Sequence, residues 1–511
     1  MNTAEQLKQH VSLLELVADL VEIDEADRGK LGITVSGVKI DSREIEAGDL
    51  FIACFGFNHD ARDYIQETIA QGATAVLAES GGHWNGVQFI DDVPVIAVEK
   101  LSAKISDIAG RFFMDPSAQL SVFGITGTNG KTSCSQFIAE SLAEFDYHCG
   151  IIGTLGYGSV GQLKETSLTT PDPVFTQRAL AEMVIDQVEP VVMEVSSVGL
   201  HQNRVAAVHF DTAIFTNLSR DHLDYHDSME EYGDNKRKLF MMEGLRCAVV
   251  NLDDPFALSI LNGIDSEVDI ITYSRSNEIA TVCAQSLEFT EQGFKARIKT
   301  PLGVGDIEGS LLGEFNFSNV LAVAAALVGY LPGRIDLTMA QLCKSLSRLN
   351  PVSGRMEIVP GPGEVTAVVD YAHTPDGLRS ALCALRDHFE GSVWCVFGCG
   401  GNRDQGKRPL MGEIAEAYAD HIVIADDNPR KEDGDRIVQH ILSGLTNAGQ
   451  AVVIRDRAEA IGWALKNAKA GDVVLVAGKG HETYQDIDGV KHMFSDVKQV
   501  RLAQQKLAGK N

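Results

Sequence analysis

A glycine-rich loop between an apolar segment and a helical segment is the feature that most restricts the folds open to this 511-residue chain. Residues 124–133 read Gly-Ile-Thr-Gly-Thr-Asn-Gly-Lys-Thr-Ser, after the apolar run 120–123 and before the helical pattern 133–143. Gly127 and Gly130 let backbone N–H groups converge on phosphates, Lys131 can reach the β- and γ-phosphate oxygens, and the Thr132 hydroxyl can bind Mg²⁺. The spacing departs from the G-x-x-x-x-G-K-[ST] pattern because Ile125 stands where that pattern has its first glycine. The loop predicts a strand, a phosphate-binding turn and a helix; a chance glycine turn is the alternative.

The length and the pattern of apolar runs predict an α/β protein of three domains. Residues 1–117 contain short apolar runs at 49–54, 73–78 and 93–98, typical of a small mixed α/β domain. Residues 118–349 alternate helical patterns with apolar runs at 121–126, 190–195, 212–217, 247–251 and 269–273. Several of these runs lack period-two alternation, as expected for parallel strands buried on both faces, so we predict a central P-loop mononucleotide-binding parallel sheet. Residues 350–511 continue with runs at 367–371, 393–397, 421–425 and 473–477 and a helical stretch at 457–468, which predicts a Rossmann-like C-terminal domain.

The charge balance and the absence of certain segments exclude several classes of function. Forty-four Lys and Arg against 71 Asp and Glu give a net charge of -27, which repels nucleic acid and anionic membrane surfaces. No apolar run approaches the roughly 18 residues of a membrane span, and the N-terminus lacks the features of an export signal. The nine cysteines show no C-x-x-C spacing, which favours reduced thiols over disulfides or zinc. We expect a cytoplasmic monomer with small-molecule partners, no nucleic acid and no membrane insertion.

Two further polar motifs directly follow apolar runs of the P-loop segment. Glu194-Val-Ser-Ser follows the run 191–193, and Asn217-Leu-Ser-Arg-Asp-His222-Leu-Asp follows another. In open α/β sheets ligands bind beyond the carboxyl ends of the strands, so Glu194 and His222 are candidates to complete a Mg²⁺ site beside the P-loop. A capping carboxylate and a histidine satisfied by its neighbours are the alternatives for these two residues.

Together with three other segments, these motifs resemble the Mur ligase family, which comprises ATP-dependent amide-forming enzymes of peptidoglycan precursor assembly. The three segments are Asp41-Ser-Arg43, Gly313-Glu-Phe-Asn-Phe-Ser-Asn319 and Gly478-Lys-Gly-His-Glu482. The resemblance spans nearly the whole chain and is greatest to members that add 2,6-diaminopimelate to UDP-N-acetylmuramoyl-L-alanyl-D-glutamate. It implies a reaction through an acyl phosphate, with ATP as a substrate, Mg²⁺ as the cofactor, and Lys131, Glu194, His222 and Lys236 as catalytic residues.

The resemblance also implies which residues bind the two larger substrates. For ATP they are Gly127, Thr128, Asn129, Gly130, Lys131, Thr132, Ser133, Asn316, Asn319, Arg355 and Asp370. For the UDP-muramoyl peptide they are Ile40, Ser42, Phe57, Asn58, His59, Thr169, Thr170, Ser196, Gln202 and Arg204. Arg204 also fits on physical grounds, since a planar guanidinium binds a carboxylate or phosphate bidentately. Leu168 stands where family members can carry asparagine, so no side-chain hydrogen bond is expected there.

Lys236 matches the lysine that family members carbamylate with CO₂. Carbamylation converts a cation into an anion able to ligate a second Mg²⁺ beside His222, so the resemblance implies Thr132, Glu194, His222 and the Lys236 carbamate as metal ligands. The polar segment 234–238 read alone predicts a solvated lysine on a helix surface instead. Lys238 is a nearby rival for the modification.

The third domain is expected to select the amino acid, through residues that match the diaminopimelate site of the family: Arg403, Asp427, Asn428, Pro429, Arg430, Gly478 and Glu482. Diaminopimelate carries a second amino acid centre, whose carboxylate can take a bidentate arginine. Lysine lacks that carboxylate and would leave a buried Arg430 unpaired, which can reject it by orders of magnitude. A plain strand-end turn with a surface arginine is the alternative for residues 427–430.

Three other functions remain open from the sequence. Folylpolyglutamate synthetase shares the P-loop variant and the reaction type, although the long segment before Ser121 argues against it. A lysine-adding ligase of the same family is the second. A P-loop switch or regulatory protein without ligase activity is the third.

Overall fold

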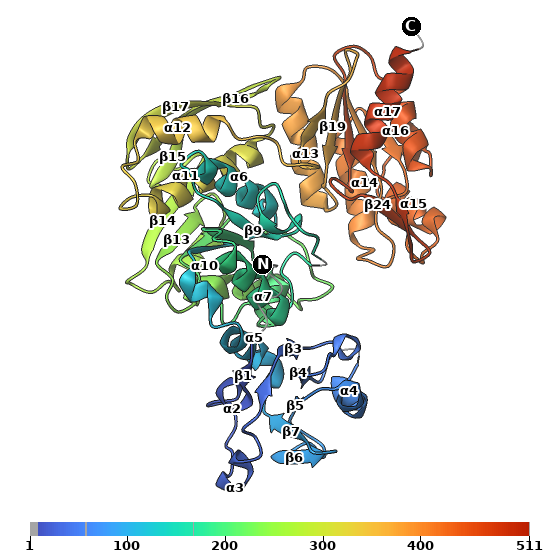
Figure 1. Cartoon of the computed structure of the whole chain (residues 1–511). Helices are drawn as coiled ribbons and strands as arrows, with labels where there is room; N and C mark the ends of the chain where they lie inside the picture. The colour runs from blue at the N-terminus through green and yellow to red at the C-terminus, as the bar shows by residue number, and fades with distance from the viewer. Residues whose placement is uncertain (1–8, 57–58, 167, 510–511) are drawn as a thin grey trace.

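The computed structural model describes residues 9–56, 59–166 and 168–509, which form three lobes around sheets of five, ten and six strands (Figure 1). The predicted site residues Phe57 and Asn58 lie outside the described residues. The expected α/β class is confirmed, since each of these sheets is mainly parallel and is covered by helices. All nine cysteines are free thiols, as expected.

The N-terminal lobe is a small α/β unit with strand order β3-β4-β5-β7-β6, in which only β6 is antiparallel. The sheet consists of β3 (Gly37–Lys39), β4 (Asp49–Ala53), β5 (Ala75–Glu79), β6 (Val87–Ile90) and β7 (Val93–Val98). The remaining elements are β1 (Val11–Ser12), α2 (Leu13–Leu16), α3 (Glu25–Arg28), β2 (Thr34–Val35), η1 (Ser42–Glu44), η2 (Ala61–Tyr64), α4 (Ile65–Gln71) and α5 (Leu101–Phe112). Alternate strand residues pack against α5 on one face, as Leu50 does, and against α4 on the other, as Phe51 does.

The central lobe contains the predicted parallel sheet, with strand order β10-β9-β11-β8-β12-β13-β14-β15-β16-β17. Its strands are β8 (Val122–Thr126), β9 (Gly150–Gly153), β10 (Gly156–Ser159), β11 (Val191–Glu194), β12 (Thr212–Phe215), β13 (Cys247–Asn251), β14 (Asp269–Ser274), β15 (Val282–Thr290), β16 (Gly293–Thr300) and β17 (Gly303–Gly309). Its helices are η3 (Pro116–Gln119), α6 (Lys131–Ala143), α7 (Pro173–Ile185), α8 (Ser197–His201), α9 (Met229–Arg237), η4 (Lys238–Met241), α10 (Ala257–Leu261), α11 (Glu314–Tyr330) and α12 (Met339–Ser347). Every residue of β8, β11, β12 and β13 is buried. This confirms the prediction that the apolar runs without period-two alternation are parallel strands covered on both faces.

Two features of the central lobe were not anticipated from the sequence. The parallel strands continue into the antiparallel strands β15, β16 and β17, and the burial pattern of β16 alternates because one face is solvated. The apolar helix α11 packs in the same core as α6, where Phe123 and Phe137 also lie. Because α11 is apolar around most of its circumference, it lacks the amphipathic stripe that marks a surface helix.

The C-terminal lobe is a doubly wound sheet with order β18-β19-β23-β20-β21-β22, in which only β18 is antiparallel. Its strands are β18 (Glu357–Val359), β19 (Thr366–Asp370), β20 (Val393–Phe397), β21 (His421–Ile424), β22 (Ala451–Val453) and β23 (Val473–Ala477), with a hairpin of β24 (Tyr484–Ile487) and β25 (Val490–Met493). Its helices are α13 (Pro375–His388), α14 (Lys407–Tyr418), α15 (Gly434–Leu442), η5 (Ala448–Gln450), α16 (Arg457–Asn467) and α17 (Asp496–Ala508). Helices α13, α14 and α15 cover one face and α16 and α17 the other, as expected for a Rossmann-like domain.

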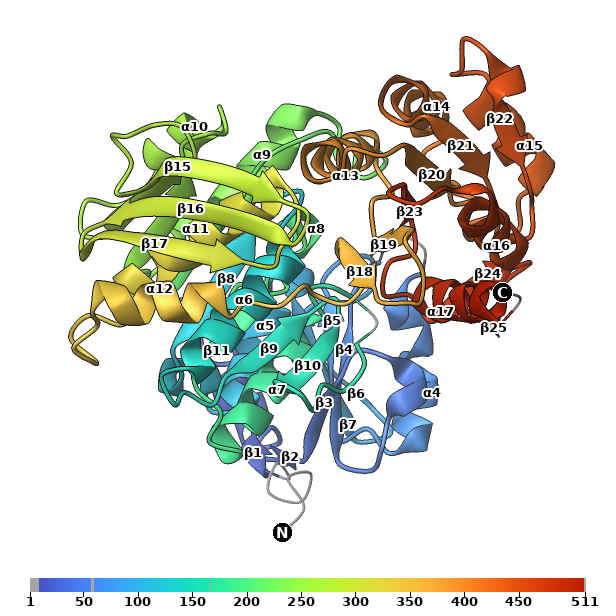
Figure 2. The ribbon, with the colours of Figure 1, turned by 90° about the horizontal axis from the view of Figure 1, so that it is seen from above.

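The lobes meet at two junctions on the central lobe. The N-terminal lobe joins it near α5 and α7, where the Ala207 amide donates to Ser106 Oγ at 3.0 Å. On the other side α13 lies between the central sheet and the rest of the C-terminal lobe, as Figures 1 and 2 show. There His388 Nε2 accepts from the Gly313 amide at 2.9 Å and the ring also bonds the Thr290 carbonyl. These junctions bring residues from strand ends of the central and C-terminal sheets to one shared cavity.

Candidate active site

The P-loop adopts the predicted strand, turn and helix. It follows β8, Gly127 and Gly130 have φ of 151° and 87°, and α6 begins at Lys131. A side chain at Gly130 would clash with Asn319 of α11, so the positive φ and the close approach both require glycine there. Lys131 Nζ folds back and donates to the carbonyls of Gly127 and Thr128 at 2.7 and 2.9 Å. The loop therefore holds its cation over the turn, where phosphate oxygens could replace the carbonyls.

The buried Glu194, at the end of β11, faces the first turn of α6. Its carboxylate accepts from Thr132 Oγ1 at 2.9 Å and from the amide and hydroxyl of Thr154 at 2.8 and 3.1 Å. Strands β8 and β11 are neighbours in the sheet, which is why the predicted pair Thr132 and Glu194 lies together. Thr154, on the turn between β9 and β10, is a site residue that no motif in the sequence had indicated.

Lys236 is buried in α9 rather than solvated, so the prediction from its polar segment alone is wrong. Its side chain turns inward, donates from Nζ to the Gly127 carbonyl at 2.9 Å, and lies 4.3 Å from the centre of the Tyr232 ring. Burial, followed by the charge of Lys131, holds the pKa of Lys236 well below its ordinary value. The rival Lys238 instead donates to Asn235 Oδ1 at 2.7 Å. The pattern of polar residues in α9 could not predict the burial of Lys236, because that burial depends on contact with the P-loop, which is distant in the sequence.

His222 lies on the loop after β12, with a positive φ of 53° and a side chain 48% exposed to the cavity. Its Nε2 is 3.5 Å from Asp221 Oδ2. Desolvation within the cleft lowers the pKa of His222, the carboxylate of Asp221 opposes this, and Lys131 and Lys236 lower it further. Within the described ranges, no group of three or more His, Cys, Asp or Glu side chains forms a preassembled metal cage. Beside the P-loop, the hydroxyl of Thr132 and the carboxylate of Glu194 are two oxygen donors in direct contact.

The residues expected to hold the muramoyl peptide form a chain of contacts beside Glu194. Arg204 donates to Gln202 Oε1 at 2.6 and 3.1 Å and to the Thr170 carbonyl at 2.7 Å. Thr170 Oγ1 donates to the Glu194 carbonyl and accepts from the Ser196 amide, both at 2.9 Å, while Thr169 Oγ1 contacts Thr154 Oγ1 at 3.0 Å. Gln202 also donates to Tyr225, which the sequence motifs did not single out.

The three described residues of the expected uridine site, Ile40, Ser42 and His59, lie at one edge of the N-terminal sheet. Ile40 and Ser42 follow β3, and His59 follows the adjacent parallel strand β4. The carboxyl ends of parallel neighbours share a sheet edge, so these residues belong to one surface. His59 is exposed and Ile40 half-buried.

The four other residues expected to bind the nucleotide come from two lobes. Asn316 and Asn319 are buried in α11, and Asn319 Nδ2 donates to Asn316 Oδ1 at 3.3 Å. Arg355 extends from the C-terminal lobe, where its guanidinium lies 4.4 Å from the centre of the Tyr371 ring and donates to Thr132 Oγ1 at 3.4 Å. Asp370 accepts from the amides of Met356 and Ala372 at 2.7 and 2.8 Å, which holds the turn that carries Arg355.

A cavity of about 610 Å³ opens between the central and C-terminal lobes, and it receives most of the predicted amino acid selector. Its lining from the central lobe includes Asp221 and His222. From the C-terminal lobe it includes Arg403, Asp427, Asn428, Arg430, Gly478 and Glu482. Pro429 is buried behind this wall.

The expectation that Arg430 is buried is wrong, because its side chain is 27% exposed at the cavity wall. Its Nη1 donates to the Gly401 carbonyl at 3.0 Å, and its Nε is 3.9 Å from Asp486 Oδ2. Arg403 is exposed on the neighbouring loop after β20, the loop that also carries Gly401. Tyr371, His373, Lys407 and the buried Lys479 complete the surroundings and were missed, because only the tertiary fold brings their loops to this cavity.

Three comparisons with known proteins agree with this geometry. Family models described as Mur ligase family, catalytic domain, Mur ligase middle domain, and Mur ligase, glutamate ligase domain match residues 34–113, 125–327 and 354–480. A relative from Coxiella burnetii named UDP-N-acetylmuramoyl-L-alanyl-D-glutamate–2,6-diaminopimelate ligase is 44% identical over 92% of this chain and 96% of its own length. A protein of that name from Pseudomonas aeruginosa is 46% identical over 92% of this chain and 95% of its own length. A solved structure with the same name superposes with a TM-score of 0.69 at 34% identity, covering 98% of this chain and all of the other.

Proposed function

The chain belongs to the Mur ligase family, and on that premise we propose that it adds meso-2,6-diaminopimelate to UDP-N-acetylmuramoyl-L-alanyl-D-glutamate in an ATP-dependent reaction of cytoplasmic peptidoglycan precursor synthesis. The observation that carries the proposal is the shared cavity, where the Asp221-His222 loop beside the P-loop faces the Arg430 and Glu482 cluster. A phosphate-binding loop on one lobe and an amino acid selector on another suit a ligase better than a nucleotide switch. The names of the relatives favour diaminopimelate over lysine or folate as the substrate.

The reaction proceeds in two steps on the acceptor peptide. A substrate carboxylate oxygen attacks the ATP γ-phosphorus, forming an acyl phosphate and releasing ADP. The amine of diaminopimelate then attacks the acyl carbon, and the tetrahedral intermediate expels phosphate as the amine loses its proton. Closure of the C-terminal lobe excludes water, which would otherwise hydrolyse the acyl phosphate.

The chain's own residues position ATP and stabilise the phosphoryl group in transfer. Backbone amides from Gly127 to Ser133 surround the phosphates, and Lys131 moves from its carbonyl partners to the β- and γ-phosphate oxygens. Asn316 and Asn319 line the nucleotide side, while Arg355, held by the turn at Asp370, closes over the phosphates. Catalysis is mainly positioning and electrostatics.

Magnesium fits the residues that surround the P-loop. Thr132 Oγ1 and the Glu194 carboxylate are hard oxygen donors within 2.9 Å of one another, and Mg²⁺ prefers one or two such protein ligands together with phosphate oxygens. His222 and the carbamate of Lys236 are the proposed ligands of a second ion. When bound, the ions neutralise charge that develops on the transferring phosphoryl group.

The burial of Lys236 supports its proposed carbamylation. Burial lowers the pKa of Lys236 well below its ordinary value and so favours the neutral amine, whose nitrogen can attack CO₂ with loss of a proton to form a carbamate. The product would be an anion within reach of the Lys131 charge, in place of a buried amine whose protonated form Lys131 repels.

The remaining substrate contacts are assigned by position. Ile40, Ser42, Phe57, Asn58 and His59 hold the uridine nucleotide, and Thr169, Thr170, Ser196, Gln202 and Arg204 hold the muramoyl peptide. Arg403, Asp427, Asn428, Pro429, Arg430, Gly478 and Glu482 form the diaminopimelate site. We also propose that the enzyme acts as a monomer. In the part of the chain that the structure covers, no helix combines the length and the apolar character needed to cross a bilayer.

Two measurements test the proposal. ADP release is measured with purified UDP-muramoyl dipeptide and with diaminopimelate isomers or lysine as the amine; release that depends on diaminopimelate is expected. A dipeptide labelled with oxygen-18 in the acceptor carboxylate should transfer label to the released phosphate. Turnover that ignores both the dipeptide and the amine would refute ligase activity, and unlabelled phosphate would refute the acyl phosphate.

A further inference from the structure

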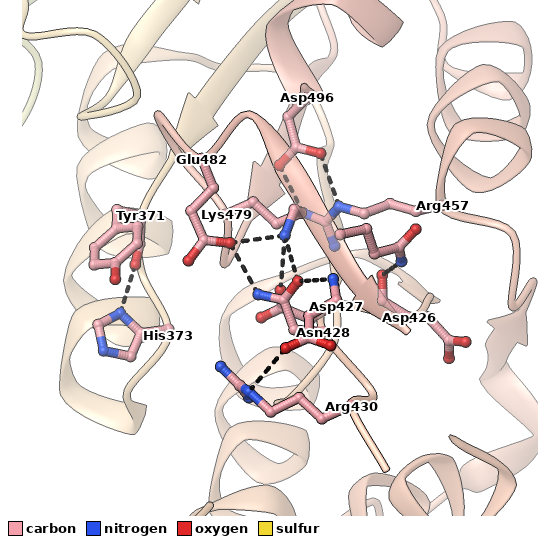
Figure 3. A network of polar contacts seen from close by, with 12 residues as sticks. Tyr371, His373, Asp426, Asp427, Asn428, Arg430, Arg457, Lys479, Glu482 and Asp496 are labelled. Carbon is pink, nitrogen blue, oxygen red and sulfur yellow. Dashed lines mark hydrogen bonds and ion pairs between the residues drawn. The ribbon is translucent and has the colours of Figure 1, made fainter. Parts of the chain in front are cut away.

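Lys479 is the most deeply buried cation of the amino acid selector, with a side chain that is 0% exposed. It follows Gly478 in the turn after β23, and its Nζ donates to Glu482 Oε2 at 2.7 Å and to Asn428 Oδ1 at 2.9 Å (Figure 3). Asp427 Oδ1 lies 3.5 Å away. A buried ammonium costs free energy unless it is paired and hydrogen-bonded, and all its partners here belong to the proposed diaminopimelate site.

The contacts of Lys479 determine which way the Asn428 amide faces. An ammonium has donors only, so the oxygen of Asn428 must point toward it. The Asp486 amide donates to the same oxygen at 2.9 Å. The amide nitrogen of Asn428 then points to Glu482, to which it donates at 2.9 Å. With its oxygen used twice, Asn428 has only an N–H left to offer a ligand in the cavity.

Lys479 also fixes the orientation of Glu482. One oxygen of this carboxylate, Oε2, receives both Lys479 and Asn428, while Glu482 still lines the cavity. The second oxygen is thus the one available to accept from a ligand ammonium. The buried cation also separates Glu482 from Asp427, two carboxylates that would repel each other without it.

The resulting wall is complementary to a zwitterion. Arg430 and the Asn428 N–H present donors for a carboxylate, and Glu482 presents an acceptor for an ammonium, all at the same cavity. We propose that Lys479 is a positioning residue that fixes Asn428 and Glu482 as donor and acceptor for the distal amino acid centre of the amine substrate. This inference rests on the proposed function, since it concerns recognition of that same substrate.

The test compares Lys479→Met with Lys491→Met in the full-length enzyme. Methionine keeps length and apolar bulk but removes the charge and all three donors. Lys491 is an exposed lysine on the neighbouring hairpin, and it lies over the Tyr484 ring without contacting Asn428 or Glu482. Steady-state ADP release gives KM for diaminopimelate, ATP and UDP-muramoyl dipeptide separately. Melting curves and circular dichroism report folding.

Lys479→Met should raise KM for diaminopimelate by about tenfold or more, with the other two KM values changing less than about twofold. Its preference for diaminopimelate over lysine should fall, and Lys491→Met should match the wild type. An unchanged KM for diaminopimelate, or a parallel rise in all three KM values, would overturn the proposal in favour of a structural role. If Lys479→Met does not fold, Lys479→Arg replaces it in the test, because arginine keeps the charge but displaces the donors. The same result is then required, namely a rise in KM for diaminopimelate without a comparable rise in the KM values for ATP and the dipeptide. Absence of diaminopimelate-dependent turnover in the wild type would instead refute the proposed function itself.

Discussion

Replacing Arg457 by methionine should strongly destabilise the C-terminal lobe, because it removes one partner of a fully buried ion pair. Arg457 Nε and Nη2 donate to the Asp496 carboxylate at 2.7 and 2.8 Å, and both side chains are 0% exposed. Nη2 also donates to the Ala477 carbonyl at 2.9 Å, at the end of β23. Leaving one charge of such a pair buried and unpaired costs about 3–5 kcal/mol. We expect a loss of that size in the free energy of unfolding.

Arg455→Met is the matched control, since Arg455 stands two residues away and pairs with Asp426 and Asp435. Its side chain is 37% exposed, so solvent screens the interaction and the expected cost is about 1 kcal/mol or less. A double variant, Arg457→Met with Asp496→Leu, removes both buried charges and should recover at least about half of the loss.

Urea denaturation followed by tryptophan fluorescence measures these differences. Two of the chain's three tryptophans, Trp394 and Trp463, lie in the C-terminal lobe, and Trp463 belongs to the helix that Arg457 begins. Their signal therefore reports this lobe even if the three lobes unfold separately. Equal costs for Arg457→Met and Arg455→Met, or a double variant no more stable than Arg457→Met, would refute the reasoning.

Four further outcomes are expected. Gly127→Ala should lower kcat/KM for ATP by about a hundredfold or more, since the new Cβ would meet the Thr216 hydroxyl and φ is 151°. In mass spectra of native protein with bicarbonate, Lys236→Arg should abolish a gain of one CO₂ that Lys238→Arg retains. Arg430→Met should lower kcat/KM for diaminopimelate by about 30-fold or more but affect lysine less, since only diaminopimelate carries the distal carboxylate. Burial and, secondarily, Arg355 lower the pKa of His481 to about 4. Between about pH 6.5 and 4 the native state therefore binds fewer protons than the unfolded chain, and it loses stability as the pH falls. The loss of stability caused by His481→Asn should consequently be smaller at pH 5 than at pH 7.

Each of these has a control or a contrary result. Gly333→Ala tests backbone strain without crowding, because Gly333 has a φ of 83° and a Cβ at this position would have no atom within 4 Å, and it should leave ATP kinetics unchanged. A CO₂ gain that survives Lys236→Arg would place the modification elsewhere. Equal losses for diaminopimelate and lysine in Arg430→Met would remove this arginine from selection. An identical deficit for His481→Asn at both pH values would exclude His481 as a source of the pH dependence.

The three α/β lobes could be predicted because their determinants are local. The runs that became β8, β11, β12 and β13 are continuous in apolar residues, and parallel burial on both faces produces that pattern directly. The P-loop was recognisable because its glycines and Lys131 lie within a few residues of each other. Glu194 was a candidate from its position at a strand end, whereas the role of Asp427 was assigned through the resemblance to the family.

Other features depend on contacts between distant segments and could be decided only by the tertiary structure. Lys236 reads as a surface lysine until α9 packs on the P-loop and places its Nζ against the Gly127 carbonyl. Lys479 acquires its role only when β21 and β23 bring Asn428 and Glu482 to its ammonium. The sequence by itself determined the lobes and the phosphate loop, because hydrophobic periodicity and glycine conformation act over short stretches of chain. The burial of charges and the pairing of side chains were determined by packing, since desolvation and hydrogen bonding depend on which atoms surround a group in space.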